Sequence, residues 1–501
     1  MKFRSLLTAA ALAALPTLAQ AESKVRKITL DECIQEAFAN NLEIKIVKYM
    51  PELAELSLSS TYGSYDPQYS FNYGANKNTF PAQSRLGEPL SPPRESWSEN
   101  FGMGLSGLLP TGANYRFFGD MNPLRTKYYD PISQQYAYQD PTYSGRAGVE
   151  LSQPLLQDMW IDQARWAISL SKKSILQEEQ AVRSQLIQTA TDIQVAYYRV
   201  AASRENIQVQ KKAVELAERL LEENKKRVEV GAMAPLESQQ AEAQLASTRT
   251  DLINAQKDYG LAQNTLRRLL TSDYSDIANT TFDPTDKFVP QPYPFNRMES
   301  WSRGLSSRPD IVRSQLALEK QNVTIRFRRN QMFPQMDLVS SFSASALANE
   351  LGTSLNDISN TDYKSYGVGA RFTFPLGNRT ASSNFKSAKV ERERLILQHK
   401  QLEQSIMAAI DNAILVAQSA LEGIQSTKQA RIYAEQALDA EQKKLENGKS
   451  TTFEVLRLQR DLTTASSNEV RALLDYHAAM AVLFQDEGST LDRLGIKVTS
   501  N

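Results

Sequence analysis

A seven-residue spacing of apolar side chains limits how this chain can fold more than any other feature. The spacing holds at Leu186, Ile193, Val200, Ile207, Val214, Leu221 and Val228. An earlier register at 168, 175 and 182 joins it through a four-residue step, which is a stutter in the repeat. We therefore predict one long helix over residues 155–230. Its roughly 76 residues would extend about 114 Å, a length that no single globular core requires.

The same order of elements occurs twice along the chain. A helix at 28–60, begun by a Thr29–Glu32 capping-box spacing, precedes a β-region at 66–153, the long helix and a return helix at 235–271. Residues 272–297 contain several prolines and are expected to form an irregular linker. The second repeat, 298–485, is expected to hold a helix, a β-hairpin at 335–375, a long helix at 380–446 and a return helix at 452–485. A polar tail, 486–501, follows.

Constant sequence offsets support an internal duplication. Gly231 and Gly448, at the breaks between long and return helices, are 217 positions apart, as are Glu237 and Glu454. Upstream of the β-regions the offset is 267, and just after them it is 221. Because offsets change only in loops, we interpret residues 22–271 and 298–485 as two copies of one module. The first β-region is 46 residues longer than the second.

Alternation of apolar with small or polar residues predicts strands in both β-regions. Tyr69, Phe71 and Tyr73 alternate with Ser70, Asn72 and Gly74. Residues 108–112 have the character of a turn between strands at 97–108 and 113–119. This additional hairpin either extends an extracellular loop or adds strands to the sheet, and we favour the extracellular extension.

The N-terminus and the hydropathy pattern indicate an exported protein. Residues 1–21 have a basic start, a short apolar core and an Ala-Gln-Ala site, which is typical of a signal peptide. After residue 21 the chain has no run of 18 apolar residues, so no transmembrane helix is predicted. A membrane-spanning form would need a closed β-barrel; each repeat offers at least two strands, so the chain has at least four, and four strands cannot close a barrel. Several chains would have to share it. The predicted fold class is therefore α+β and mainly α.

Composition removes several classes of function. Lys plus Arg and Asp plus Glu both number 57, so no basic surface argues for nucleic acid. The chain has only two histidines, His399 and His477, and one cysteine, Cys33. Metal sites built on His and Cys, redox chemistry between cysteines and intrachain disulfides are therefore not expected, and without a convincing acid–base constellation we do not expect an enzyme.

Several short motifs, in order and in duplicate, resemble the outer membrane efflux protein family, the TolC-type channels. The motifs lie at residues 30–41, 153–156, 227–231, 308–311, 334–338, 374–377 and 445–448. The resemblance implies a homotrimer with a β-barrel in the outer membrane and a coiled-coil-like helical tunnel in the periplasm. It also implies two partners, a periplasmic adaptor (membrane fusion) protein and an inner-membrane transporter that supplies the energy.

The resemblance also implies a function for the two helix turns. Gly231 and Gly448 would lie at the periplasmic tip, near Arg227 and Leu445, where an adaptor hairpin docks. The plain alternative is that each glycine only caps a helix.

Acidic residues just beyond these turns are candidates for the channel entrance. Glu237 and Glu454 match acidic positions of the family, whereas Arg457 replaces a second acidic residue. We therefore expect a weakened cation-binding ring. The basic residue that locks some closed tips is also replaced, here by Ser450, and no detailed lock is carried over.

These observations favour a passive outer membrane channel for drug efflux or type I protein secretion. The alternative is a periplasmic coiled-coil adaptor or scaffold without a pore. Two helical hairpins and glycine-rich alternating strands argue against that alternative, because an adaptor typically has one hairpin and a membrane anchor.

Overall fold

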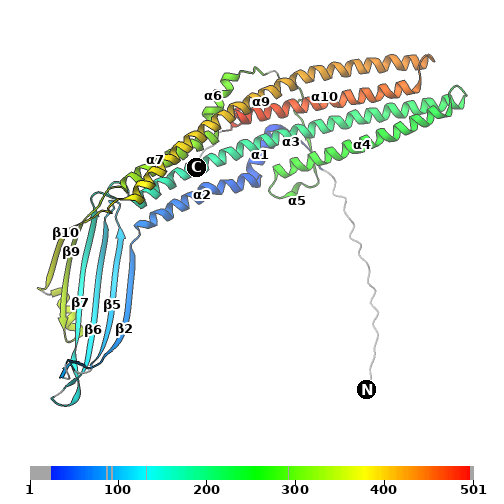
Figure 1. Cartoon of the computed structure of the whole chain (residues 1–501). Coiled ribbons are helices and arrows are strands. Elements are labelled where there is room, and N and C mark those ends of the chain that lie inside the picture. Colours follow the sequence, from blue (N-terminus) through cyan, green and yellow to red (C-terminus); the bar gives the residue numbers. More distant parts are fainter. Residues whose placement is uncertain are drawn as a thin grey trace, which may run out of the picture.

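The computed structural model describes residues 24–85, 88–91, 94–130, 132–291, 293–360 and 362–496. The expected signal peptide, 1–21, lies outside these ranges. The molecule is elongated, with a β-sheet at one end and two long helical hairpins extending to the other (Figure 1). The fold is α+β and mainly α, as the sequence predicts.

Eight helices form the body of the described chain. They are α1 (Leu30–Asn40), α2 (Leu42–Tyr62), α3 (Gln163–Glu229), α4 (Pro235–Leu270), α6 (Arg297–Ser307), α7 (Pro309–Asn330), α9 (Arg379–Glu446) and α10 (Thr452–Asp486). Shorter helical segments are η1 (Gly63–Tyr65), α5 (Tyr274–Ile277), α8 (Leu351–Asn360) and α11 (Thr490–Arg493).

Two helix boundaries differ from the expected ones. The long helix begins at Gln163 rather than at 155, because Asp162 caps it by accepting a hydrogen bond from the Arg165 amide at 2.7 Å. The helix expected at 28–60 is divided at Asn41, whose side chain caps α2 by accepting hydrogen bonds from two amides of its first turn. The capping box of Thr29 and Glu32 is present at the start of α1.

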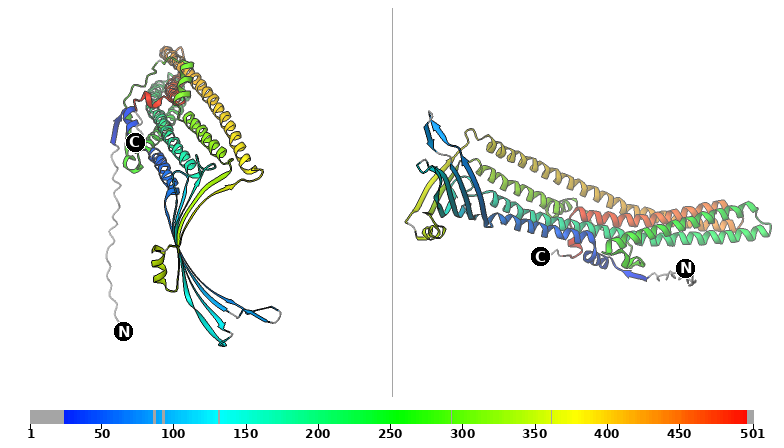
Figure 2. Two further views of the ribbon diagram at one scale, coloured as in Figure 1. Left: turned by 90° about the vertical axis from the view of Figure 1, so that its left-hand side faces the viewer. Right: turned by 90° about the horizontal axis from the view of Figure 1, so that it is seen from below.

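The helices form two successive regions along the length of the molecule (Figure 1). Next to the sheet, α2 packs on α3, α3 on α7 and α7 on α9, so that the helices form a wall (Figure 2). Farther away, the hairpins α3–α4 and α9–α10 lie together through contacts between α3 and α10. Of the seven-residue series, Leu186, Ile193, Val200 and Leu221 are buried. The heptad seam therefore does pack the long helix against its neighbours.

Six long antiparallel strands make the main sheet, in the order β10-β9-β7-β6-β5-β2. They are β2 (Gln68–Phe80), β5 (Arg94–Leu108), β6 (Asn114–Asp130), β7 (Gln135–Pro154), β9 (Gln335–Ala348) and β10 (Lys364–Thr373). A small separate hairpin joins β3 (Gln83–Arg85) to β4 (Glu88–Ser91).

The additional hairpin of the first repeat belongs to the main sheet. Strand β5 pairs with β2 on one side and with β6 on the other, and β6 pairs with β7. The favoured expectation of an extracellular extension is therefore wrong. The turn between β5 and β6 lies at the helical end of the sheet, since a Cβ on Gly112 would come within 3.0 Å of the Arg165 side chain and of the Asp158 carbonyl oxygen.

The sheet has one apolar and one polar face. A row of apolar side chains crosses all six strands in register, at Tyr69, Leu105, Phe117, Val149, Phe342 and Tyr366. The neighbouring row on the opposite face is Gln68, Ser106, Arg116, Glu150, Ser341 and Gly367. Successive residues of a strand point to opposite faces, so this alternation makes one surface largely apolar and the other largely polar, with Phe118 an apolar exception on the polar face.

The linker and the C-terminal segment are more ordered than expected. Within 272–297, β8 (Thr280–Pro284) pairs in parallel with β1 (Lys24–Ile28). In the expected polar tail, Leu491 packs into a core with Ile44 and Leu186. Both segments are held by partners far away in the sequence, which composition alone does not reveal.

Candidate functional site

The first helix turn ends in a Schellman motif built on Gly231. The Ala232 amide donates to the Arg227 carbonyl oxygen at 2.8 Å, and the Gly231 amide to that of Val228 at 3.0 Å. Gly231 has a φ of 74°, in the left-handed region that favours glycine. No atom lies within 4 Å of the position that a Cβ would occupy. The glycine therefore caps the helix and leaves its own surface open.

The second turn repeats this geometry at Gly448. The Lys449 amide donates to the Lys444 carbonyl oxygen at 2.8 Å, the Gly448 amide donates to that of Leu445 at 3.1 Å, and φ of Gly448 is 69°. Its Cβ position is also empty to 4 Å. We call residues 227–237 and 445–457 the hairpin tips.

The tips are joined to one another by two polar contacts. The Arg227 Nη1 donates to the Leu445 carbonyl oxygen at 3.2 Å, and the Thr452 hydroxyl donates to Glu237 Oε2 at 2.7 Å. Beneath them, Leu445, Val455 and Leu456 are buried in one apolar cluster with Leu220 of α3 and Leu438 of α9. The structure thus joins Arg227 to Leu445, both of which the family resemblance places at the tip.

The charges at the tips are partly neutralised in place. Arg457 forms an ion pair with Glu454 at 2.6 Å across one helical turn. Glu237 accepts its hydrogen bond from Thr452, and within the described residues Glu237 and Glu454 are not joined by a hydrogen bond. Sequence reasoning missed Thr452; its position at the start of α10 was the only available signal.

The polar face of the sheet carries charged residues close together. Arg116 and Arg146 flank the ring of Phe118, at 5.5 and 4.6 Å from its centroid. Each guanidinium also approaches the Glu150 carboxylate at 3.9 Å. This mixed-charge, half-exposed surface is suited to contact with water rather than with lipid.

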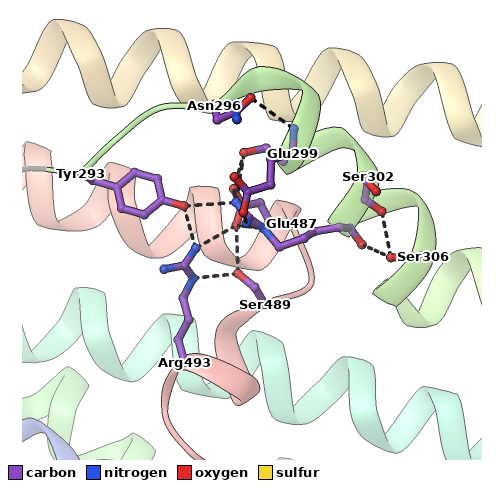
Figure 3. Close-up of polar contacts among 10 residues, drawn as sticks. Tyr293, Asn296, Glu299, Ser302, Ser306, Glu487, Ser489 and Arg493 are labelled. Carbon is purple, nitrogen blue, oxygen red and sulfur yellow. Dashed lines mark hydrogen bonds and ion pairs between the residues drawn. The ribbon is translucent and has the colours of Figure 1, made fainter.

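The buried carboxylate of Glu487, just after α10, links α6 and α11. Glu487, which has no exposed side-chain surface, accepts hydrogen bonds from Arg303 at 3.0 and 3.2 Å, from Ser489 at 3.0 Å and from Arg493 at 3.3 Å (Figure 3). Burial raises the pKa of Glu487, but hydrogen bonds from Arg303 and Ser300 outweigh it, so that the pKa lies below its usual range. The network ties α11 to α6, and sequence reasoning did not find it.

The histidines are engaged on helix faces. His399 Nδ1 lies 3.0 Å from the Ser314 hydroxyl, and the His477 ring stacks on Tyr198 with centroids 4.0 Å apart. Across the described ranges, no group of three or more His, Cys, Asp or Glu side chains is arranged to hold a metal ion. No helix in the same ranges is both long enough and apolar enough to cross a membrane.

Comparisons with known proteins identify the family. The family described as Outer membrane efflux protein matches residues 126–272 and 301–488. The chain is 23% identical to the outer membrane protein TolC of Escherichia coli, over 86% of this chain and 84% of TolC, and 23% identical to the outer membrane efflux protein BepC of Brucella suis, over 71% and 75%. The CmeC outer membrane channel of Campylobacter jejuni matches the fold with a TM-score of 0.65 at 16% identity, over 92% of this chain and 86% of CmeC.

The family match defines a membrane transport protein and not an enzyme. The chain belongs to the outer membrane efflux protein family. It is an outer membrane efflux channel of the TolC type. The alternative of a pore-free periplasmic adaptor is thereby set aside.

Proposed function

We propose that three copies of this chain form a passive conduit that carries cargo from a periplasmic adaptor and its inner-membrane transporter to the cell exterior. The observation that carries the proposal is the separation of apolar and polar side chains across all six strands of a sheet whose two outer strands, β2 and β10, each lack a second neighbour in that sheet.

Closure of the sheet follows from the physics of lipid. Unpaired backbone groups at a sheet edge are costly in hydrocarbon, so β2 and β10 need partners there. If β10 of one copy pairs with β2 of the next, three copies supply eighteen strands, six from each. Barrels of about 16–18 strands leave an aqueous channel. The apolar row then faces lipid, and the row with Arg116 and Glu150 faces the lumen.

The hairpin tips are proposed as the docking site of the adaptor. Gly231 and Gly448 leave open surface, and large apolar side chains are exposed beside them: Val230 is 78%, Leu236 62% and Phe453 56% exposed. Exposed apolar groups of this size at the end of a polar rod favour a protein partner. Arg227 and Leu445 hold the two tips at a fixed spacing for it.

The acidic residues of the tips are proposed to line the channel entrance. Glu237 keeps a net negative charge because its partner, Thr452, is neutral, whereas Arg457 offsets the charge of Glu454. A ring of three copies would therefore have a weak cation preference. The channel needs no cofactor, because the transporter supplies the energy.

A cysteine cross-linking experiment tests the docking site. The only native cysteine, Cys33, is buried, so an introduced cysteine is the sole accessible one. We expect Ala232→Cys and Lys449→Cys to cross-link in cells to an adaptor, with Lys428→Cys, inside α9 and away from the turn, as the matched control. Cross-linking at the control position but not at the tips would contradict the proposal.

A further inference from the structure

A cavity of about 810 Å³ lies where the sheet meets the helical wall. It is bounded by the end of α2, the start of α3 and the last turns of α7. We call it the collar pocket and define it by Tyr62, Tyr65, Trp160, Arg326, Arg329 and Phe333.

The collar pocket opens on the side of the wall away from the proposed lumen. Tyr62 and Tyr65 are three positions apart in a helical turn and share one face. Ser64, between them, lines a separate hollow with Arg116 and Glu150 of the polar sheet face. The two hollows have no lining residue in common. The tyrosines therefore point to the side on which the sheet is apolar.

Neighbouring copies would leave this pocket uncovered. The wall runs in the order α2, α3, α7, α9, so adjacent copies meet at α2 and α9. Of the two edge helices, α2 contributes only Tyr62 to the lining and α9 contributes nothing, whereas α3 and α7 supply most of it, so the pocket is centred inside those edges. Its occupant therefore comes from the surroundings of the assembly.

Two arginines in the pocket have no counter-charge. Arg326 and Arg329 are exposed and lie three positions apart on α7, and neither side chain forms a hydrogen bond or an ion pair within the described part of the chain. Arg165, also in the lining, is already paired with Asp162 at 2.9 Å. Among the described residues, no acidic side chain lines the pocket, so within the lining the charges of Arg326 and Arg329 are not offset.

Aromatic side chains surround these arginines. Trp160 is 76% exposed, Phe333 47% and Tyr62 43%. Exposed tryptophan and tyrosine are typical of the boundary between hydrocarbon and water in membrane proteins. The apolar strands begin immediately beyond the pocket, so its depth matches the headgroup layer of the periplasmic leaflet.

We propose that the collar pocket binds the headgroup of an anionic phospholipid from the periplasmic leaflet. Arg326 and Arg329 would hold the phosphate, since guanidinium groups form strong charge-assisted hydrogen bonds with phosphate oxygens. Trp160 and Phe333 would pack against the glycerol and the upper acyl chains. The inference rests on the orientation of the sheet in the membrane proposed above.

Native mass spectrometry of the purified assembly tests this binding. The delipidated protein is incubated with phosphatidylglycerol or with phosphatidylcholine, and the bound lipid is counted. We expect phosphatidylglycerol to be preferred, and Arg326→Gln/Arg329→Gln to weaken its binding about 30-fold. The matched control, Arg313→Gln/Lys400→Gln, removes the same charge from exposed positions on α7 and α9 and should bind as the unmodified protein does.

Three results would overturn the inference. They are equal retention of both lipids by the unmodified protein, full retention of phosphatidylglycerol by the collar variant, and displacement of the lipid by equimolar inorganic phosphate. Single-channel conductance, measured in parallel, separates this inference from the channel proposal. A collar variant that conducts normally but loses the lipid supports both, whereas an unmodified protein without conductance contradicts only the channel.

Discussion

Glu487 offers a direct test of what holds α6 and α11 in place. Its carboxylate is fully buried and accepts hydrogen bonds from Arg303 and Arg493, whose side chains are only 29% and 33% exposed. Glu487→Gln keeps the shape of the side chain and removes its charge. Both guanidiniums would then face a neutral amide, and one of the Glu487 oxygens would be replaced by a competing donor.

The magnitude follows from the burial of the pair. Removal of one partner from a buried ion pair costs about 3–5 kcal/mol, and the partial exposure of the two arginines places this network at the lower end, about 3 kcal/mol. This corresponds to opening of α6 and α11 that is more frequent by a factor on the order of 100. The effect should be local, because the wall and the hairpins do not depend on this carboxylate.

Hydrogen exchange measured by mass spectrometry reports that opening directly. We expect amides of 297–307 and 490–493 to exchange on the order of 100-fold faster in Glu487→Gln, with the hairpins unchanged. The control is Glu299→Gln, which also removes a carboxylate partner of Arg303 but one that is 59% exposed, and it should change exchange less than about fivefold. Equal exchange in the two variants would refute the reasoning.

Three further predictions concern pH, the tips and the entrance. Burial lowers the pKa of His477 to about 4, so the folded state holds this histidine neutral at a pH where the unfolded chain would protonate it. The resulting contribution to the free energy of unfolding, at most about 3 kcal/mol, is complete above pH 6.5 and is lost as pH falls toward 4. Thermal melts of His477→Phe should lack this loss of stability. Gly448→Ala should speed amide exchange at the tip, because alanine at this positive φ costs about 1 kcal/mol. Gly423→Ala, inside α9, should instead slow exchange, because alanine favours the helix and its Cβ meets no atom. A change of exchange rate in the same direction in both variants would contradict the cap assignment. Lysine at Glu237 and Glu454 should shift the reversal potential of bilayer currents toward anions with little change in melting temperature, and an unchanged potential would remove the entrance assignment.

Local patterns in the sequence predicted the local structure. The seven-residue spacing around Ile193 and Val200 indicated a long helix because a buried seam must recur on one helix face. The glycines at 231 and 448 indicated helix ends, and each has the positive φ of a cap. Alternation around Phe71 located strands. Each of these signals depends on neighbours within a few positions.

Pairings between distant segments were not predictable from those patterns. Membership of β5 in the main sheet depends on its hydrogen bonds to β2 and β6, which alternation does not specify. Glu487 lies in a polar segment and is buried because Arg303, 184 positions earlier, neutralises it. The contact of Thr452 with Glu237 spans 215 positions. Of the candidate site, the caps were visible in the sequence and the bridge between the tips was not.

Single-particle imaging of the purified protein in lipid nanodiscs tests the central claim most directly. The account predicts a three-fold particle in which eighteen strands, six from each chain, close around a lumen that continues through a hollow helical stalk. A monomer, a sheet with open edges or a stalk without a bore would contradict it.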